Sequence, residues 1–373
     1  MTWLFWAASA LIGYTYAGYP AWLWLRGRLH PRPVRSGPMQ PLTSIVMVVR
    51  NEERVLEQKL ENLLALEYPE EQKEVIVVSD GSTDRTEAIL RQYAAHPNVH
   101  AVFNQLSRGK ASGLNDALSI AHGEIVVFTD ARQKIEPGSL QVLVNNFADP
   151  EVGCASGQLM LGDPADGENH RGMGLYWRIE KTVREQESAS GSVVGATGAF
   201  YGVRRELLHP IPVETLLDDV YIPMEVIRAG QRVVFEPKAK AWDLPDQGTE
   251  REFGRKVRTL SGNYQLLQLQ PWLLTSENPI RFEFVSHKIL RLAVPFALVA
   301  ALLTCAWLPQ GFYRGVLFLQ VAFYALSLPG MVGIKLGPIA RACDAAFTFV
   351  VLNTAALVAF ANFVTGRKAA WTR

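Results

Sequence analysis

Cysteine is scarce in this chain, and an excess of charge of one sign is nearly absent. The 373 residues include three cysteines, and the formal net charge is +1. Cysteines so few and so widely separated form neither a metal-ligand set nor a disulfide framework, which fits a reducing cytosol. Because nucleic-acid-binding proteins carry a basic excess, the near-neutral charge argues against a nucleic-acid partner. The three cysteines are Cys154, Cys305 and Cys343.

Charged residues are also missing from four long apolar stretches. About 20 apolar residues are enough for a helix to cross the hydrocarbon core of a bilayer. The sequence therefore predicts an N-terminal transmembrane helix within residues 1–26 and about three further segments within residues 287–366. The uncharged stretches are residues 3–25, 292–313, 315–334 and 345–366.

Basic residues directly after the first stretch predict the orientation. A cleaved signal peptide, the alternative for this stretch, would carry its basic residues before the apolar region. The positive-inside rule instead keeps them cytoplasmic, so we expect a multi-pass protein of the cell membrane with a cytoplasmic central region. Four crossings would leave Arg367 outside, so a segment containing Pro329 and Gly330 is a candidate for a re-entrant path. The basic residues are Arg26, Arg28, Arg32 and Arg35.

Between the apolar stretches, residues 43–246 have the pattern of one α/β domain. Short runs rich in β-branched residues alternate with segments of helical spacing, which predicts a parallel sheet. Such sheets bind ligands beyond the carboxyl ends of their strands. Strands are expected at 44–49, 74–79, 99–103 and 124–129, and helices at 51–66, 83–94 and 110–121.

Polar residues follow three of these strands, and the expected sheet brings them to one crevice. Asn51 follows the first strand, Asp80 the second and Asp130 the fourth. Three turns that are separate in sequence thus converge at one edge of the sheet, which predicts a binding site there.

The turn from Asp80 to Asp84 has more than one interpretation. Its polar residues are good helix caps. A calcium loop is excluded, because Arg85 and Arg91 stand where such a loop needs glycine and glutamate. In a functional interpretation, Asp80 accepts a hydrogen bond from a base N–H, and Gly81 lets the backbone approach a ligand closely.

The motifs around these turns resemble family 2 glycosyltransferases of the GT-A fold, a Rossmann-like nucleotide-diphospho-sugar transferase fold. The resemblance covers about residues 43–270, and within the family it is to the membrane-integrated branch of cellulose, chitin, hyaluronan and poly-N-acetylglucosamine synthases. It rests on Val-Val-Ser-Asp-Gly-Ser-Thr-Asp at 77–84, Arg-Gly-Lys-Ala-Ser-Gly-Leu-Asn at 108–115 and Val-Phe-Thr-Asp-Ala-Arg at 127–132.

The resemblance implies a binding site for a nucleotide-sugar donor. Asp80 then contacts the uracil of a UDP-sugar, with Asp84 at the ribose side, and Lys110 reaches the diphosphate. Asp130 matches the first acid of the family's metal site, which implies Mg²⁺ or Mn²⁺. The second acid of that site is replaced by Arg132, which leaves open whether the arginine supplies part of the positive charge. Asn51 and Gly81 complete the expected donor site.

Further motifs resemble the family's acceptor side. The glycine-rich segment with Gly198, Ala199 and Phe200 implies a wall against which a sugar ring lies. In the acid pair that follows, Asp218 and Asp219, the second is the expected general base, since an acceptor hydroxyl must lose its proton as it attacks. Capping of the following helix is the alternative role of this pair.

Residues 249–286 are expected to form amphipathic helices at the membrane surface. Arg255 and Arg258 match the basic positions of the family's Gln-X-X-Arg-Trp motif, but Thr259 replaces the tryptophan. That departure weakens the case for processive chain extension in particular. The alternative role of the two arginines is contact with anionic lipid.

These features and the resemblance predict a glycosyltransferase that uses a UDP-hexose or UDP-N-acetylhexosamine at the cytoplasmic membrane face. The resemblance implies that the transfer inverts the anomeric carbon. The expected acceptor is a growing polysaccharide, which suggests accessory export subunits as partners besides membrane lipids. A membrane lipid that receives a single sugar is the alternative acceptor. An inactive scaffold in a polysaccharide export complex is an alternative of another class.

Overall fold

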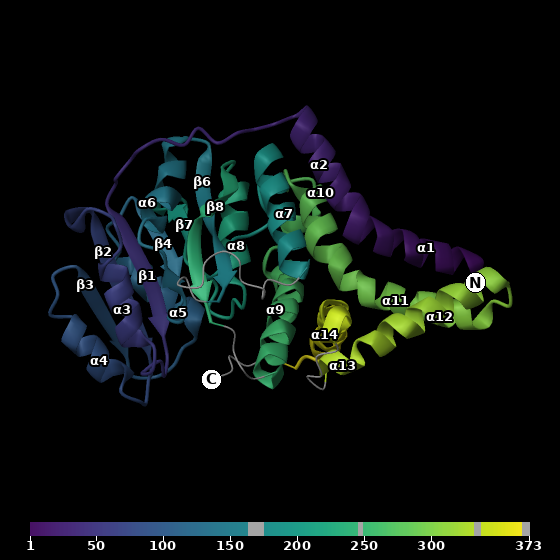
Figure 1. Ribbon diagram of the computed structural model, residues 1–373. Helices are drawn as coiled ribbons and strands as arrows, with labels where there is room; N and C mark the ends of the chain where they lie inside the picture. Colours follow the sequence, from purple (N-terminus) through teal and green to yellow (C-terminus); the bar gives the residue numbers. More distant parts are fainter. Residues whose placement is uncertain (163–174, 245–248, 332–336, 368–373) are drawn as a thin grey trace.

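The computed structural model describes residues 1–162, 175–244, 249–331 and 337–367 (Figure 1). An α/β domain occupies one side of the molecule, and a group of long helices that includes the N-terminus extends from the other side. The end of the predicted domain, residue 246, lies outside the described residues. The helical segment that follows the domain begins at Thr249.

The domain is built on one eight-stranded mixed sheet with the order β3-β2-β1-β4-β7-β6-β8-β5. The first four strands pair in parallel, as the sequence predicted. Strand β7 runs antiparallel to both β4 and β6, so one reversed strand stands between strands that run in the same direction. The strands are β1 (Thr43–Val49), β2 (Lys73–Asp80), β3 (Val99–Asn104), β4 (Ile125–Thr129), β5 (Lys134–Ile135), β6 (Val152–Leu161), β7 (Phe200–Arg204) and β8 (Arg232–Asp243).

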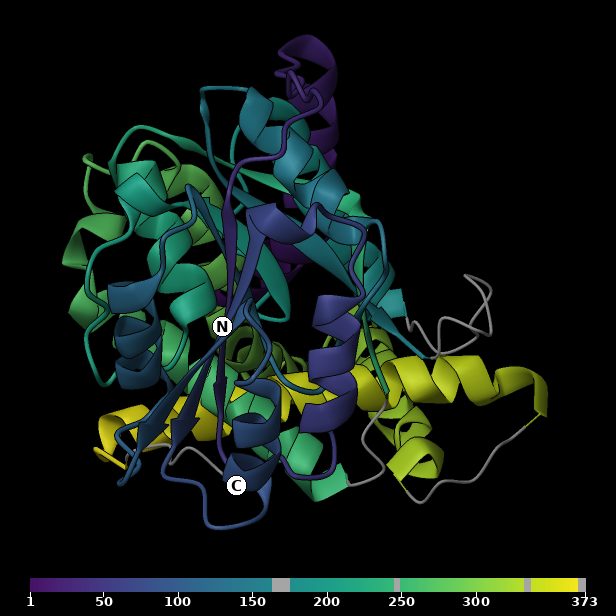
Figure 2. The same cartoon turned by 90° about the vertical axis from the view of Figure 1, so that its left-hand side faces the viewer.

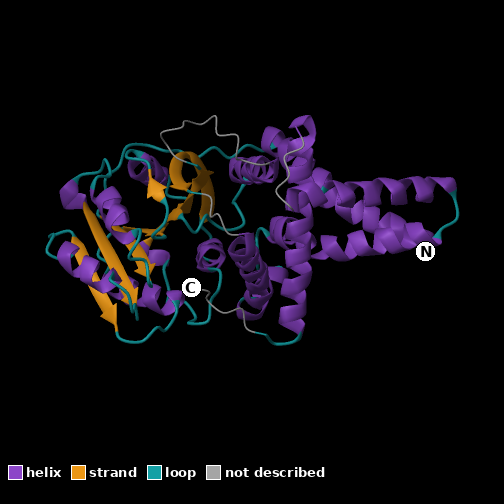
Figure 3. Ribbon diagram, turned by 60° about the horizontal axis from the view of Figure 1, so that its bottom comes forward, coloured by secondary structure: helices purple, strands orange, loops and turns teal. Residues whose placement is uncertain are grey.

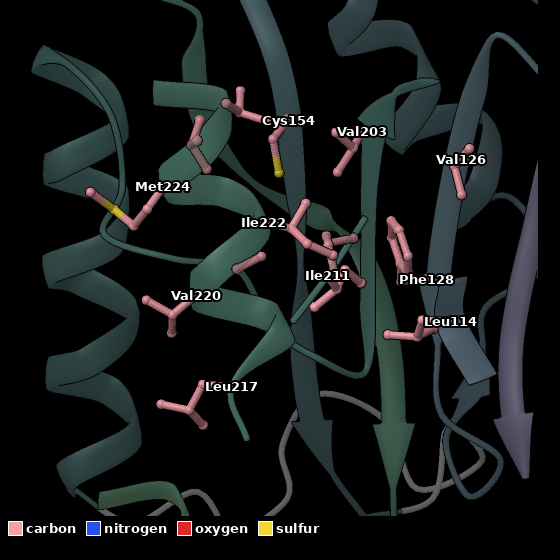
Figure 4. Packing of buried hydrophobic residues seen from close by; sticks show 14 of the residues in the cluster. Leu114, Val126, Phe128, Cys154, Val203, Ile211, Leu217, Val220, Ile222 and Met224 are labelled. Carbon is pink, nitrogen blue, oxygen red and sulfur yellow. The ribbon is translucent and has the colours of Figure 1, made fainter. Parts of the chain in front are cut away.

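Helices cover both faces of this sheet, and strand β1 is buried along its whole length. Alternate side chains of β1 enter different cores: Val46 packs with residues of α5 and α8, and Ile45 packs with residues of α3 and α6. Figure 4 shows Ile222 of α8 and Ile211 facing the strands that carry Phe128 and Val203. The domain helices are α3 (Leu56–Leu64), α4 (Thr86–Tyr93), α5 (Lys110–Ile120), α6 (Ser139–Val144), α7 (Leu175–Ser190), α8 (Asp218–Arg228) and α9 (Thr249–Leu269).

The N-terminal helix is continuous from α1 (Thr2–Gly13) through a π turn (Tyr14–Gly18) into α2 (Tyr19–Leu29). It packs along α11 (Leu290–Trp307), where alanines from the two helices form one cluster. Small residues let the backbones of apolar helices approach closely. The alanines are Ala8, Ala297 and Ala301.

Among the described residues, three helices are long and apolar enough to cross a membrane. The N-terminal helix is not one of them, because tryptophan, tyrosine and glycine lower its mean hydropathy. Its predicted crossing therefore stays a prediction, and the three C-terminal segments match the expected number. They are Arg281–Trp307, Gly311–Met331 and Ala340–Val364.

The last helix, α14 (Ala340–Val364), lies across the others rather than alongside them. It is seen end-on in Figure 1 and at full length in Figure 2, whereas α11 and α12 (Gly311–Leu326) extend away from the domain in Figures 1 and 3. Phe363 of α14 stacks on Tyr264 of α9 at 5.1 Å, and Phe360 meets Phe296 of α11. Helix α14 therefore lies between the domain and the α11–α12 pair, with the short α10 (Arg281–Phe284) and α13 (Leu328–Met331) as connections.

Candidate active site

One lysine joins the predicted donor site to the acid pair that contains the predicted base. Lys110 begins α5, and its ammonium lies 3.0 Å from Asp130 Oδ1 and 3.3 Å from Asp218 Oδ1. Burial disfavours the charged ammonium, but the two carboxylates outweigh that effect and raise the pKa of Lys110. Lys110 thus brings Asp130 and Asp218, which come from two separate turns, around one positive charge.

Asp219 stands next to this pair in the first turn of α8. Burial and the neighbouring charge of Asp218 raise the pKa of Asp219 to about 6, while Lys110 and Lys288 oppose the rise. A carboxyl group with this pKa is mostly ionised at pH 7 and can accept a proton there.

The glycine-rich segment lies against Asp219. The Ala196 N–H donates to the Asp219 carbonyl at 2.7 Å, and a Cβ at Gly198 would lie 3.1 Å from Asp219 Oδ2. Gly198 thus keeps the space beside the carboxylate open. The side chains of Ala199 and Phe200 are instead buried in the core on the other face of the sheet, so they do not form the expected acceptor wall.

Asn51 and Asp84 join two turns through hydrogen bonds. Asn51, in the left-handed region with φ 55°, accepts a hydrogen bond from the Thr83 N–H at 2.8 Å. Asp84 accepts from the N–H groups of Glu53 and Thr86, and these bonds outweigh burial and lower the pKa of Asp84. Asp84 therefore satisfies the N–H of Thr86, the first residue of α4, while Arg85 occupies the N-cap position.

Asp80 is fully buried and holds a loop. It accepts hydrogen bonds from Ser107 Oγ at 2.7 Å and from the N–H groups of Arg108 and Gly109 at 2.8 and 2.9 Å. In this arrangement a nucleobase reaches Asp80 only if the loop moves. Gly81 is required by the same loop, since it has φ +64° and a Cβ there would lie 2.5 Å from the Ser107 nitrogen.

Arg132 faces a carboxylate that the sequence did not single out. Its guanidinium donates to Asp243 Oδ2, at the end of β8, at 2.9 Å, and Gln133 donates to the same oxygen at 3.0 Å. Among the described residues no group of three or more acidic, histidine or cysteine side chains is placed to hold a metal ion. The side chain of Asp130, beside Lys110, is 42% exposed.

Lys59 is a site residue that the motifs did not reveal. Its ammonium is buried beneath the turn that carries Asp130 and donates to Thr129 Oγ1 at 2.9 Å and to the Gln133 carbonyl at 2.7 Å. Burial lowers the pKa of Lys59 to about 7, although Asp130 opposes the shift. The available signal was its position on the apolar face of α3, between Leu56 and Leu63.

Helix α9 supports the acid pair from the membrane side. Leu217 precedes α8 and rests on Gly262 of α9, where a Cβ would lie 2.5 Å from Leu217 Cγ. Gln265 accepts from the Leu216 N–H at 2.9 Å. Arg255 and Arg258 are half-buried on the same helix.

The family follows from the sequence pattern of Glycosyl transferase family 2, which matches residues 44–211. Residues 44–211 are a family 2 glycosyltransferase domain. The poly-beta-1,6-N-acetyl-D-glucosamine synthase of Staphylococcus epidermidis is 23% identical over 233 residues, which are 61% of this chain and 56% of the synthase. The synthase of Staphylococcus aureus strain COL is 23% identical over 65% of this chain and 60% of its own length.

A solved structure is similar along nearly the whole chain. The mannosyltransferase PcManGT from Pyrobaculum calidifontis, in complex with GDP-Man and Mn²⁺, matches with a TM-score of 0.74 and 25% identity. The match covers 98% of this chain and 100% of that protein. By contrast, the chain spans a little over half the length of the curated synthases. The glycosyltransferase domain thus has a GT-A-like fold, and the similarity extends into the long helices.

Proposed function

We propose that this protein transfers one sugar from a nucleotide-sugar to a hydroxyl group of a lipid-borne acceptor at the membrane surface, with inversion at the anomeric carbon. The observation that carries the proposal is the bridge from Lys110 to both Asp130 and Asp218. A diphosphate beside Asp130 and a hydroxyl beside Asp219 would then meet around one cation.

In the proposed reaction, Asp219 acts as the general base. Its carboxylate takes the proton of the acceptor hydroxyl while the hydroxyl oxygen attacks the anomeric carbon from the side opposite the diphosphate. The bond between that carbon and the diphosphate breaks, and the diphosphate leaves with the electron pair. Lys110 stabilises the negative charge that grows on the leaving group, an effect that is strong in a site sheltered from water.

Asp130 would hold a divalent cation through its carboxylate. Magnesium commonly binds through one or two carboxylates together with phosphate oxygens and water, so one acidic side chain fits this use. The ion would neutralise charge on the diphosphate, beside Lys110. Arg132, which occupies the second acid position, is paired with Asp243.

Two observations favour a single transfer to a lipid-borne acceptor. The whole-chain similarity is to a mannosyltransferase, whereas the polymer-forming synthases match over a little over half of their length. In addition, Thr259 replaces the tryptophan expected of processive enzymes. Polysaccharide extension, with export subunits as partners, is the second candidate, and the similarity to the Staphylococcus synthases supports it.

We place the glycosyltransferase domain on the cytoplasmic side of the cell membrane. The arginines that follow the N-terminal helix support this orientation, as does Arg281 before the next apolar helix. Because α14 lies across α11 and α12, we propose three crossings, by α1–α2, α11 and α12, with α14 along the cytoplasmic surface. Arg367 then stays cytoplasmic, as the positive-inside rule favours.

The test is transfer by the purified full-length protein in vesicles of membrane lipid, with Mg²⁺ or Mn²⁺ and a panel of labelled nucleotide-sugars. The panel includes GDP-mannose beside the UDP-sugars, because the relatives point to different donors. We expect label in the lipid phase with one donor. Label in a long polymer would favour the second candidate, and no transfer with any donor would favour an inactive scaffold.

The assignment of the base is tested by Asp219→Asn, with Glu185→Gln on the surface of α7 as the matched control. General base catalysis contributes about 10²- to 10⁴-fold. We expect Asp219→Asn to lose transfer by that factor and Glu185→Gln to keep it. Undiminished transfer in Asp219→Asn would remove Asp219 from the proposed role.

A further inference from the structure

The first C-terminal membrane helix changes its winding where it meets the glycosyltransferase domain. Residues Val285–Ile289 form a π turn between α10 and α11. The N-terminal helix has its own π turn, Tyr14–Gly18, and the two meet where Tyr14 Oη lies 2.8 Å from Ser286 Oγ. Single π turns within helices are frequent at functional sites, because they re-aim side chains.

The π turn carries three consecutive polar side chains, and two of them have partners. Ser286 bonds Tyr14, as described. His287 is buried between two carboxylates of α7, with Nδ1 2.7 Å from Glu187 Oε1 and Nε2 3.1 Å from Glu180 Oε1. These contacts fix the π turn against the domain and leave the third side chain, Lys288, to be explained.

Lys288 has no hydrogen bond or ion pair within the described part of the chain. The charged groups that act on it are Glu180, Arg184, Asp219 and Arg291. Glu180 already has other partners, because Arg291 donates a hydrogen bond to it at 2.6 Å and His287 also contacts it. The remaining carboxylate is that of Asp219, on which Lys288 acts electrostatically. Within the described residues the Lys288 side chain therefore has no hydrogen-bond or ion-pair partner, and the charges that act on it include that of Asp219, the proposed base. It belongs to the first of the long apolar C-terminal helices.

We infer that Lys288 binds the phosphate group of a lipid-borne acceptor whose hydroxyl is presented to Asp219. The inference rests on the proposed function and names the class of acceptor. A lysine ammonium binds phosphate as a point charge with three donors. A lipid is the source because Lys288 belongs to a membrane-spanning helix, so a head group reaches it from the bilayer. The donor has its own cation, Lys110.

Arg184 connects the surroundings of Lys288 to the acceptor side through hydrogen bonds. It lies among the charges around Lys288 and donates to Thr197 Oγ1 and, at 2.8 Å, to the Ala196 carbonyl. Those residues belong to the segment that ends beside Asp219 at Gly198. A phosphate at Lys288 would therefore lie next to a fixed wall of the acceptor site.

The test compares Lys288→Met and Lys288→Arg with Lys181→Met, a surface lysine of α7 that pairs with Glu185. Transfer is measured from pH 6 to 9 and the plateau values at high pH are compared, because Lys288 lowers the pKa of Asp219 and its removal would shift the profile. We expect Lys288→Met to raise the acceptor KM about tenfold or more, because a charged hydrogen bond contributes about 1.5–3 kcal/mol. The donor KM stays within about twofold, and Lys288→Arg and Lys181→Met stay near wild type. An unchanged acceptor KM in Lys288→Met, or equal rises in the donor and acceptor KM, would overturn the inference.

Binding is measured separately through thermal stabilisation of the full-length protein by decyl phosphate, decanol or inorganic phosphate, since a ligand that binds the folded state raises Tm. We expect stabilisation by decyl phosphate that is lost in Lys288→Met, and no dependence on Lys288 with decanol. Equal stabilisation by inorganic phosphate would assign the site to free phosphate and overturn the lipid assignment. Because this readout needs no turnover, an inactive wild-type protein would refute the proposed function while the binding result still decides the role of Lys288.

Discussion

At the scale of the residue, the site is an arrangement of opposed charges around Asp219. Burial and the negative charge of Asp218 disfavour the ionised form of the Asp219 carboxyl group, whereas the positive charge of Lys110 favours it. The balance places the pKa of Asp219 about 2 above the ordinary value of an aspartate, at about 6. A proton acceptor tuned in this way is strong enough to act and still ionised near neutral pH.

The pH dependence of transfer follows from this balance. A carboxyl group that is protonated below pH 6 cannot take the proton of the acceptor, so kcat/KM is expected to rise with pH and to level off above 7, with a midpoint near 6. Asp218→Asn removes a like charge, so the midpoint should move to lower pH. A profile that stays flat between pH 5 and 8 would contradict the role of Asp219.

Lys59 is expected to position the turn that carries Asp130. Lys59→Met removes the buried ammonium and the two hydrogen bonds that it donates to the turn. Each lost bond costs about 1–3 kcal/mol, so the turn is held less firmly. We expect the donor KM to rise several-fold and Tm to fall. Both are measured on the purified protein.

Lys73→Met is the matched control for that variant. Lys73 is also buried, but its ammonium donates to the carbonyls of Leu64 and Leu66 at the end of α3, away from Asp130. It should lower Tm to a similar degree and leave the donor KM unchanged. If Lys59→Met and Lys73→Met raised the donor KM equally, Lys59 would only stabilise the fold and would not position the turn that carries Asp130.

At the scale of the element, helix α9 sets where α8 begins. The close contact of Leu217 with Gly262 tolerates no side chain on the glycine. Gly262→Leu should push the two helices apart, displace Asp218 and Asp219, and reduce kcat at least tenfold, together with a lower Tm. Gly254→Leu on the same helix is the control, because nothing lies within 4 Å of a Cβ there.

The strands and their turns were predictable because β-branched runs and the polar residues after them are local signals. Lys110, Asp130 and Asp218, each from a segment that the sequence motifs mark, lie together in the structure. The helix expected from residue 51 begins only at Leu56, since Asn51 turns left-handed and bonds Thr83. The helical periodicity of the residues after Asn51 contains no information about a hydrogen bond between Asn51 and another turn.

Other features depend on tertiary contacts that no local pattern contains. The reversal at β7 depends on its pairing with β4 and β6. The burial of Asp80 under residues 107–109 and the pairing of Arg132 with Asp243 each join segments far apart in sequence. The acceptor wall was expected at Ala199 and Phe200, but both side chains are buried in the core, and the strand pairing that decides which face Phe200 takes involves residues elsewhere in the sequence.

At the scale of the whole molecule, the crossing position of α14 predicts the membrane topology. All three native cysteines are buried, so cysteines introduced one at a time can be labelled with a membrane-impermeant maleimide. With three crossings, Gln310→Cys should be labelled in intact cells, whereas Thr365→Cys and Glu277→Cys should react only after permeabilisation. Labelling of Thr365→Cys in intact cells would mean that α14 spans the membrane.

The contact between Tyr14 and Ser286 joins residues that are 272 positions apart. At roughly 5–20 residues per second, a ribosome completes the second residue about 15–50 seconds after the first. During that interval the N-terminal helix has no partner, because α11 has not yet been synthesised. The domain between the two helices is synthesised and begins to fold in the same interval. The membrane anchor is therefore assembled late in biosynthesis, and a nascent chain halted before residue 286 would have its catalytic domain made and its anchor unfinished.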